Sequence, residues 1–347
     1  MSEEFNCPLP IDNTIERIRL GHGGGGRLTN NLIENVFKPL FSNEYLDKLH
    51  DGAIIDLPKN KIAFTTDSYT INPIFFPGGD IGKLAVTGTI NDLAMCGARP
   101  KFLSLGLIIE EGFEIEKLKD ILNSIKVTAD KVGAMIVTGD TKVVNKGKGD
   151  GIYINTAGIG IIEHGLEILP QNVRPGDVIV LNGDVGRHGS AIMSVREGLE
   201  FESTLESDCE ELWTTVEGIL NSGVEVHCMR DLTRGGLVSA LNEIAKASGL
   251  GMYIEEEKIP VIEEVEAICE VLGLDPLYVA NEGRFIAIVP ERYGEKVVSI
   301  MSSTLGTDAR VIGKITEENP GKVIMKNLIG SNRLLDMISG EQLPRIC

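Results

Sequence analysis

Hydrophobic and polar positions along the chain follow two periods, one typical of strands and one typical of helices. Short apolar runs bounded by turn residues, such as KIAFTTD (61–67) and AMIVTGD (134–140), predict buried strands. Between them, EIEKLKDILNSIKVTADKVG (114–133) places apolar residues three and four positions apart, which predicts an amphipathic helix. Strands and helices therefore alternate from about residue 60 to residue 163, and we expect an α/β (α+β) layer structure there.

The alternation begins again after LPQNVRPGD (169–177), a segment rich in turn-forming residues. Runs such as VIVLNGD (178–184) and RFIAIVP (284–290) predict further strands, each followed by helical spacing. The stretch SNRLLDMIS (331–339) predicts a short capped helix that ends at Gly340. A chain of this length suits two domains. The expected division is an arm with a glycine-rich loop (1–40), an N-terminal domain (41–168), a C-terminal α/β domain (169–330), and a short helix with a tail (331–347).

The acidic charge balance narrows the classes of function. The formal net charge is −18, so the surface repels nucleic acid and anionic lipid, and we expect neither as a partner. An anionic substrate such as a nucleotide would need bound cations, which makes the carboxylates candidates for holding Mg²⁺. No apolar run approaches the ~20 residues of a membrane span, and we expect no signal peptide because the segment MSEEFNCPLP (1–10) is acidic and lacks an apolar core. The six cysteines form no C-x-x-C pair, and we expect a reduced, cytoplasmic protein.

Polar residues of the first half stand where ligand contacts are common. The loop GHGGGGR (21–27) runs towards a helix start and could cradle a phosphate, through Gly24 and Gly25, or act as a hinge. Asp67 and Asp140 end apolar runs, where a carboxylate could bind Mg²⁺ or cap a turn.

A helix and a strand end add three more candidates. Asn91 and Asp92 interrupt an otherwise apolar helix, and polar groups on a core-facing stripe need partners. Lys142 stands two residues from Asp140 and could neutralise a phosphate, take part in proton transfer or be a surface lysine.

The second half adds candidates in three glycine-containing segments. Glu282, in ANEGRF, could be a base that points into a cleft or part of an exposed turn. His188, in GDVGRHGS, could be a catalyst or a surface residue. In MRDLTRGGL (229–237), Asp231 or Thr233 could cap the following helix.

The last residue is a cysteine, Cys347, in the ending LPRIC. It belongs either to a frayed terminus or to a thiol on a movable arm. Residues 341–347, if extended, would span at most ~24 Å at roughly 3.4 Å per residue. That reach is enough to carry a thiol from solvent into a neighbouring cleft.

Taken together, these segments resemble the ATP-using superfamily of aminoimidazole ribonucleotide synthetase, selenophosphate synthetase and thiamine-phosphate kinase. Within it, the match is closer to the HypE family of hydrogenase maturation factors. The resemblance lies in GHGGGGR, FFPGGDIGKLAVTGTINDLAMCGARP, GDTKVV, GDVGRHG, MRDLTRGGL, ANEG and the terminal PRIC, which follow the family order from residue 21 to residue 347.

The resemblance implies a PurM-like fold, in which the N-terminal domain pairs with its twin as a barrel across a homodimer. It also implies a carbamoyl dehydratase that converts a carbamoyl group on Cys347 into a thiocyanate with ATP and Mg²⁺, and so supplies the cyanide ligands of nickel–iron hydrogenases. The implied partners are the carbamoyltransferase HypF and the HypC–HypD iron-binding complex. By family match, Asp67, Asp92 and Asp140 hold Mg²⁺ on the triphosphate, with Gly24, Gly25 and Asn91 as further nucleotide contacts. The resemblance further implies that Lys142 would lie near the transferred phosphoryl group and that Glu282 would be the base, with His188 as a weaker candidate for the same network.

Two rival functions stay open at this point. A small-molecule kinase or synthetase of the same superfamily would leave Cys347 without a role. A non-catalytic carrier or scaffold would use Cys347 to hand on a group that was made elsewhere.

Overall fold

Four strands of the N-terminal half form one sheet in the order β1-β6-β4-β5. The computed structural model describes residues 17–19, 32–43, 61–198 and 205–337, and every structural statement below concerns those parts of the chain. The strands are β1 (Lys61–Tyr69), β4 (Arg99–Glu110), β5 (Met135–Val144) and β6 (Ile152–Ile162). Strands β4 and β5 are parallel and need a long crossover, which helix α4 (Ile115–Val132) provides. Strand β6 runs antiparallel to both β1 and β4.

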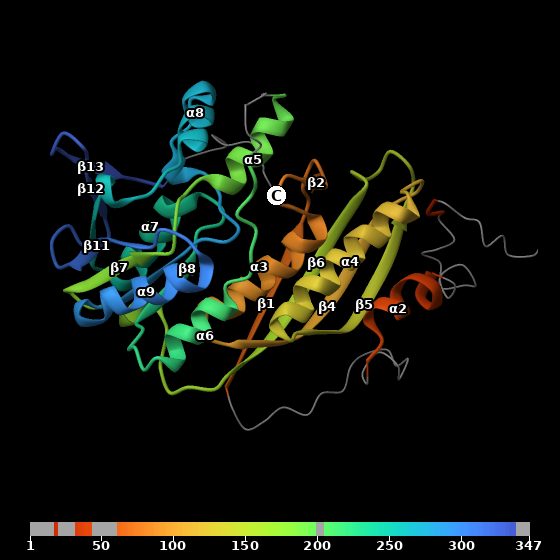
Figure 1. Cartoon of the computed structure of the whole chain (residues 1–347), viewed down its shortest axis with the longest axis horizontal. Helices are drawn as coiled ribbons and strands as arrows, with labels where there is room; N and C mark the ends of the chain where they lie inside the picture. The colour runs from red at the N-terminus through yellow and green to blue at the C-terminus, as the bar shows by residue number, and fades with distance from the viewer. Residues whose placement is uncertain (1–16, 20–31, 44–60, 199–204, 338–347) are drawn as a thin grey trace, which may run out of the picture.

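Helices α3 (Ile81–Met95) and α4 lie against one face of this sheet (Figure 1). Helix α4 is amphipathic, as predicted, and buries Leu118, Ile121 and Ile125 while its charged residues remain accessible to solvent. Asp80 caps the N-terminus of α3, and its carboxylate accepts hydrogen bonds from two backbone N–H groups of the first turn. Thirteen of the fifteen residues of α3 are buried, because this helix lies between the sheet and the C-terminal half.

The C-terminal half is built on a seven-stranded sheet in the order β13-β12-β9-β11-β7-β10-β8. Strands β9 and β12 are parallel, and the other neighbouring strands are antiparallel. The strands are β7 (Asp177–Leu181), β8 (Cys228–Asp231), β9 (Gly251–Glu255), β10 (Phe285–Pro290), β11 (Arg310–Thr316), β12 (Val323–Lys326) and β13 (Asn332–Leu335). The helices are α5 (Arg187–Arg196), α6 (Trp213–Asn221), α7 (Gly236–Ser248), α8 (Glu263–Leu272) and α9 (Gly294–Leu305).

Short elements complete the described chain. They are η2 (Ile33–Phe37), α2 (Lys38–Phe41), β2 (Phe75–Phe76), β3 (Gly79–Asp80), η4 (Pro170–Asn172), η5 (Glu256–Lys258), η6 (Pro276–Tyr278) and η7 (Glu291–Tyr293). No helix in the ranges given above is both long and apolar enough to cross a membrane.

The structure confirms the alternating strands and helices and corrects three details. Residues 332–335 form strand β13 rather than a helix, because they pair with β12 across a turn that is closed by a hydrogen bond of 2.9 Å from the Asn327 N–H to the Ser331 carbonyl. Strand β12 itself was not predicted from the sequence. Asp67 and Asp140 lie inside β1 and β5 rather than at their ends, since each strand continues past the aspartate.

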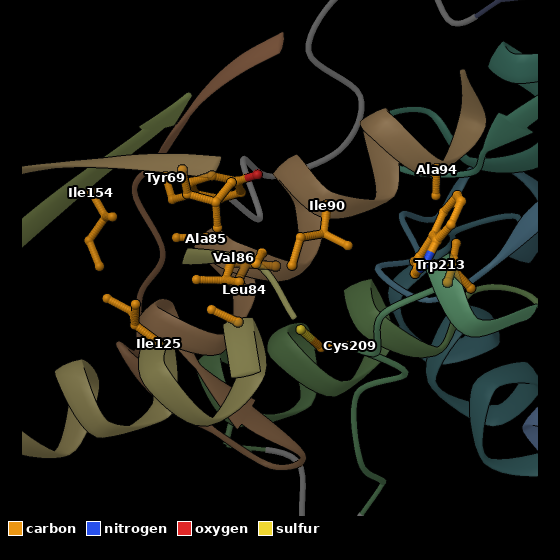
Figure 2. Packing of buried hydrophobic residues seen from close by; sticks show 14 of the residues in the cluster. Tyr69, Leu84, Ala85, Val86, Ile90, Ala94, Ile125, Ile154, Cys209 and Trp213 are labelled. Carbon is orange, nitrogen blue, oxygen red and sulfur yellow. The ribbon is translucent and has the colours of Figure 1, made fainter. Parts of the chain in front are cut away.

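One hydrophobic cluster passes through both halves of the chain. In Figure 2, Tyr69 and Ile154 lie on one side of α3, and Cys209 and Trp213, from the C-terminal half, lie on the other. Apolar side chains of α3 such as Leu84 and Ile90 fill the space between them. The core is therefore continuous across the expected boundary at residue 168, and the domain limits remain predictions.

The face of the N-terminal sheet that is turned away from α3 and α4 stays accessible. Strand β1 alternates between half-buried and exposed residues along most of its length, and its outer face carries Ile62 and Phe64. The Phe64 side chain is 68% exposed, and Ile108 of β4 is also exposed. Large apolar side chains thus stand uncovered on this outer face in the described chain.

Candidate active site

A small acidic cavity lies where β1, α3, β8 and the turn before β10 meet. Its volume is about 50 Å³. It is lined by Asp67, Ser68, Tyr69, Gly88, Asp92, Asp231, Thr233, Arg234 and Glu282. Four of these nine residues are carboxylates and one is basic. Three of the four carboxylates are site residues predicted from the sequence, and they come from both halves of the chain, so folding brings these candidates together here.

The carboxylates of the cavity repel one another. Burial, and then the charge of Asp92, raises the pKa of Asp67 to about 6, although Arg234 acts in the opposite direction. Burial and the charge of Asp92 likewise raise the pKa of Asp231 to about 7. Asp92 itself accepts a hydrogen bond of 2.7 Å from the Thr65 hydroxyl. Because these carboxylates are buried close to one another, a bound proton or cation lowers their mutual repulsion and is favoured in the cavity.

The carboxylates of the cavity are suited to bind Mg²⁺ together with the phosphate oxygens of a ligand. In the described ranges, no three His, Cys, Asp or Glu side chains are gathered closely enough to hold a metal ion by themselves. Mg²⁺ in nucleotide sites usually takes one or two carboxylates and completes its shell with phosphate oxygens and water. Asp67, Asp92 and Asp231 could supply those carboxylate oxygens. The cavity is much smaller than the ~300 Å³ of the smallest common ligand pockets, so a nucleotide would lie across its mouth.

Tyr69 is a site residue that the sequence reading missed. Its side chain is buried, and burial, followed by the charges of Asp67 and Glu282, raises its pKa well above the ordinary value. The phenol is therefore neutral and can donate a hydrogen bond. A Cβ atom at Gly88 would lie 2.2 Å from the Tyr69 hydroxyl, so this glycine of α3 makes room for it. The sequence did contain a sign of this role. Tyr69 lies two residues after Asp67 in the same predicted strand, and residues two apart in a strand point to the same face.

Asp231 and Arg234 are further residues whose place in the site was not predicted. Both belong to MRDLTRGGL, in which Asp231 was considered only as a helix cap. Asp231 ends β8, which is the edge strand of its sheet, and this edge faces α3. Arg234 is the single basic residue among the nine that line the cavity.

Glu282 lies in the cavity wall on a tightly held turn. The residue is only 4% exposed, which excludes the alternative of an exposed turn. Its backbone N–H donates to the carboxylate of Asp208 at 3.2 Å. Its carbonyl accepts hydrogen bonds from the side chain of Asn91 and from the Glu210 N–H.

The structure does not bring Asn91 and His188 into the cavity. Asn91 is buried one position before Asp92 on α3, and its amide binds backbone groups of Glu210, Leu212 and Glu282. It joins the two halves of the chain instead of facing a ligand.

His188 lies in the core, next to Phe76, and its Nδ1 atom is 2.8 Å from the Ser207 hydroxyl. Burial lowers its pKa to about 4, so the ring is neutral.

Asp140 and Lys142 lie on the outer face of the N-terminal sheet. Across the sheet, Asp140 is in register with Gly106, and Gly106 with Asn155. Asp67 is in register with Thr156, the residue after Asn155. Thr156 faces α3, because its hydroxyl is 2.6 Å from the hydroxyl of Thr89 on that helix. Since successive residues alternate faces, Asp140 points away from Asp67. The Asp140 carboxylate and the Lys142 ammonium are 3.5 Å apart, and both side chains are largely exposed.

Some of the predicted residues lie outside the described ranges. They are Gly24, Gly25 and Cys347. The four cysteines that the structure describes are Cys96, Cys209, Cys228 and Cys269. Burial raises the pKa of all four thiols, that of Cys228 to about 12, so none of them is readily ionised.

A larger cavity of about 980 Å³ lies in the C-terminal half, between η5, η6 and α8. None of the residues predicted from the sequence as catalytic, nucleotide-binding or metal-binding lines it. Two of its arginines are already paired, Arg284 with Asp184 at 2.7 Å and Arg333 with Asp275 at 3.0 Å. The small acidic cavity is therefore the better candidate for chemistry.

Comparisons with known proteins agree with this fold. Residues 49–162 match the N-terminal domain, and residues 174–326 the C-terminal domain, of the AIR synthase related proteins. The carbamoyl dehydratase HypE of Azotobacter vinelandii is 48% identical over 331 residues, which cover 95% of this chain and 97% of that protein.

Solved structures extend the likeness to three dimensions. A HypE crystal structure in complex with ATP has a TM-score of 0.91 and 44% identity, and the match covers 95% of this chain and 99% of that one. A HypE–HypF complex matches with a TM-score of 0.78 and 45% identity over 88% of this chain and 99% of that one. With this fold and this identity over nearly its whole length, the chain belongs to the HypE family of carbamoyl dehydratases.

Proposed function

We propose that this protein uses ATP to remove water from a carbamoyl group carried on its own Cys347, which leaves a thiocyanate as a source of cyanide for hydrogenase maturation. The observation that carries the proposal is the acidic cavity, where carboxylates suited to a cation lie beside a buried glutamate in a member of the HypE family. A similar HypE has been solved with ATP.

The reaction has two steps, and each releases one amide proton. The carbamoyl oxygen of S–C(=O)–NH₂ attacks the terminal phosphorus of ATP, ADP departs, and the loss of one N–H proton gives S–C(OPO₃²⁻)=NH. The C–O bond then breaks, phosphate carries away the original carbamoyl oxygen, and a base takes the second N–H proton to leave S–C≡N. ATP is needed because oxide is a poor leaving group and phosphate is a good one.

Glu282 is the proposed base for the second proton. Its backbone is anchored on both sides, and it shares the cavity wall with Asp67 and Asp92. A fixed base close to the reacting group is favoured because orientation lowers the barrier. The neutral hydroxyl of Tyr69, in the same wall, can donate a hydrogen bond to a developing negative charge.

Asp67, Asp92 and Asp231 are the residues that would hold Mg²⁺ on the phosphates. Such an ion supplies positive charge to the triphosphate and so lets an anionic ligand enter an acidic protein. Arg234 adds the cation that the chain itself contributes to the cavity.

Cys347 is proposed as the carrier because the alternatives in the described chain are unsuitable. The thiols of Cys209, Cys228 and Cys269 are buried, and burial raises the pKa of each. Cys96 is exposed, but desolvation and then the charge of Asp92 raise the pKa of its thiol as well. An unperturbed thiol has a pKa of about 8.5, which leaves a usable fraction ionised at neutral pH. The resemblance to the HypE family implies that Cys347 is the residue that meets a loading enzyme and then enters the cavity.

A homodimer would cover the outer face of the N-terminal sheet. Ile62, Phe64 and Ile108 are exposed there, and a two-fold contact between two such faces would bury them. Asp140 and Lys142 lie on the same face, and we propose that they serve the nucleotide of the second copy. Subunits that carry only Asp92→Ala, mixed with subunits that carry only Asp140→Ala, should then regain part of the activity.

The proposed partners follow the family, and the proposed location is the cytoplasm. A similar HypE has been solved in a complex with HypF, which fits HypF as the enzyme that loads the carbamoyl group. The HypC–HypD complex is the proposed acceptor of the product.

Intact-protein mass spectrometry tests the proposal. Carbamoylated protein that is incubated with Mg²⁺ and ATP should lose the mass of one water, and the Asp92→Ala and Glu282→Gln variants should not. Normal nitrile formation in both variants would reject the assigned site and favour a carrier of groups made elsewhere. A carbamoyl adduct that never loses water would favour a kinase or synthetase acting on a small molecule.

A further inference from the structure

A buried carboxylate, Asp208, lies directly behind the turn that carries Glu282. Its side chain has no exposed surface. Its Oδ2 atom accepts hydrogen bonds from the backbone N–H of Glu282 at 3.2 Å and from that of Gly283 at 3.0 Å. A buried carboxylate is costly unless such donors satisfy it. The proposed chemistry makes no direct use of this group.

Asp208 is held mainly by those two N–H groups rather than by an ion pair. The nearest cation is Arg284, whose Nη1 atom is 4.0 Å away. The guanidinium of Arg284 already donates to the Asp184 carboxylate at 2.7 Å and to the Asp184 carbonyl at 2.8 Å. The shortest of these contacts of Asp208 are therefore those with the two N–H groups that flank the Cα atom of Glu282.

The segment that carries Asp208 is clamped between the two halves of the chain. The Ser207 N–H donates to the Pro77 carbonyl at 2.9 Å, and the Leu212 N–H donates to the Asn91 side chain of α3 at 2.8 Å. On the other side, a Cβ atom at Gly283 would lie 2.0 Å from the Asp208 carbonyl, so segment and turn are in direct contact. The segment that contains Asp208 is therefore bonded to α3 on one side, and Asp208 itself is bonded to the Glu282 turn on the other.

Both ends of the Glu282 residue are fixed by this arrangement. Its N–H is held by Asp208, and its carbonyl accepts hydrogen bonds from the Asn91 amide at 3.3 Å and the Glu210 N–H at 3.4 Å. Fixing the backbone on both sides of a side chain limits the directions in which that side chain can point. A base placed about 1 Å from its productive position loses roughly 100-fold in rate.

We infer that Asp208 is a positioning residue, which aims the Glu282 carboxylate at the carbamoyl nitrogen through hydrogen bonds to the turn. This inference rests on the role proposed for Glu282. Asp208 is not among the residues that line the cavity, so its replacement should affect the rate of water loss and leave nucleotide binding unchanged.

The test compares single-turnover water loss in the full-length carbamoylated protein with Mg²⁺ and ATP. Asp208→Asn keeps the shape but loses the charge and one acceptor, and it should slow water loss by roughly 100-fold with an unchanged KM for ATP. Asp177→Asn is the matched control, because Asp177 is also buried and pairs with His227 away from the cavity. It should keep the wild-type rate.

A double variant decides whether Asp208 acts through Glu282. Asp208→Asn combined with Glu282→Gln should be no slower than Glu282→Gln alone, because a base that is absent cannot be misplaced. A double variant whose rate loss equals the product of the two single losses would overturn the inference. Water loss at the wild-type rate in Asp208→Asn would overturn it as well. If Asp208→Asn does not fold, Asn91→Asp, which removes a donor to the other side of the same residue, should give the same kinetic pattern.

The two proposals fail in different ways. Wild-type water loss in Glu282→Gln would reject the proposed base. Slow water loss in Glu282→Gln with full-rate Asp208→Asn would reject the positioning role alone.

Discussion

The hydroxyl of Thr65 donates a hydrogen bond of 2.7 Å to a carboxylate oxygen of Asp92, and this bond ties strand β1 to helix α3 beside the acidic cavity. The orientation of Asp92 is thus set from the neighbouring strand and not by α3 alone.

Replacing Thr65 with valine should weaken the binding of Mg²⁺ and ATP. The change keeps the shape of the side chain but removes the donor that orients Asp92. A hydrogen bond to a charged group contributes about 1.5–3 kcal/mol, so nucleotide affinity should fall by about 10-fold or more. Calorimetric titration of Mg²⁺ and ATP measures the change. Thr65→Ser keeps the hydroxyl and should bind as the wild type does, and equal losses in the two variants would contradict this role.

The stability of the metal-free protein should fall as pH rises through the weakly acidic range. In the folded state the pKa of Asp67 is about 6 and that of Asp231 is about 7, both above the ordinary 3.8. Between these values the folded state binds more protons than the unfolded state, so the free energy of unfolding decreases with increasing pH. Asp231→Asn removes one of the two groups and should flatten the dependence of Tm on pH.

The measurement is calorimetry in EDTA from about pH 5 to about pH 8. Asp130→Asn is the control, because it makes the same change in net charge at an exposed position. A shift of about 1 kcal/mol corresponds to roughly 1–2 °C in Tm for a chain of this length, because the entropy of unfolding grows with chain length. If Tm depends on pH in the same way in Asp231→Asn and in Asp130→Asn, the pKa of Asp231 is not raised in the folded state.

Alanine at position 88 should disturb the site from inside α3. Its Cβ atom would lie 2.2 Å from the Tyr69 hydroxyl. Overpacking of this kind destabilises a core by about 1–3 kcal/mol, and the displaced phenol should lower the rate of water loss as well. Denaturant unfolding of Gly88→Ala measures the first effect. Gly165→Ala, where nothing lies within 4 Å of the new methyl group, serves as the control.

Removing the Tyr69 hydroxyl should relieve part of this clash. The oxygen is the atom closest to the position that the new methyl group would take, while the ring carbons are 3.1 Å or more away. Gly88→Ala combined with Tyr69→Phe should therefore be more stable than the sum of the two single changes predicts. Additive losses would mean that the hydroxyl is not the obstacle.

A charge at Phe64 should break the proposed dimer. Phe64 is 68% exposed on the outer face of the sheet, where we expect a second copy to bind. Phe64→Glu would bury an unpaired charge in that contact, so the variant should sediment as a monomer and lose activity. Val271→Glu changes an equally exposed apolar residue on α8, at 67%, and should stay dimeric. A dimeric, active Phe64→Glu variant would refute the contact.

Much of the fold follows from periodicity, and the site follows only in part. Asp92 and Glu282 stand out in the sequence because each interrupts or borders an apolar run, and folding brings both to the cavity. Asp231 looked like an ordinary helix cap, since nothing local shows that the edge of the second sheet meets α3. Whether a residue such as Asp231 lies in the site depends on contacts between segments that are far apart in the sequence.

The residues that sequence reasoning placed differently show which information was lacking. The strand containing Asp140 was predicted, but the face on which Asp140 lies depends on the register of β5 against β4. A one-residue change of register would reverse that face. His188 follows a glycine-rich turn of the kind that often carries catalysts, yet its ring packs beside Phe76, in the core. Burial depends on tertiary packing that the local pattern does not encode.

The most direct test of the central claim follows the carbamoyl oxygen. Protein carbamoylated at Cys347 with a heavy isotope of oxygen in the carbonyl group is incubated with Mg²⁺ and unlabelled ATP, and the released phosphate is analysed by mass spectrometry. The account predicts that the label appears in inorganic phosphate in proportion to the thiocyanate formed. Label that is found in water, or that stays on the protein while ATP is consumed, would contradict it.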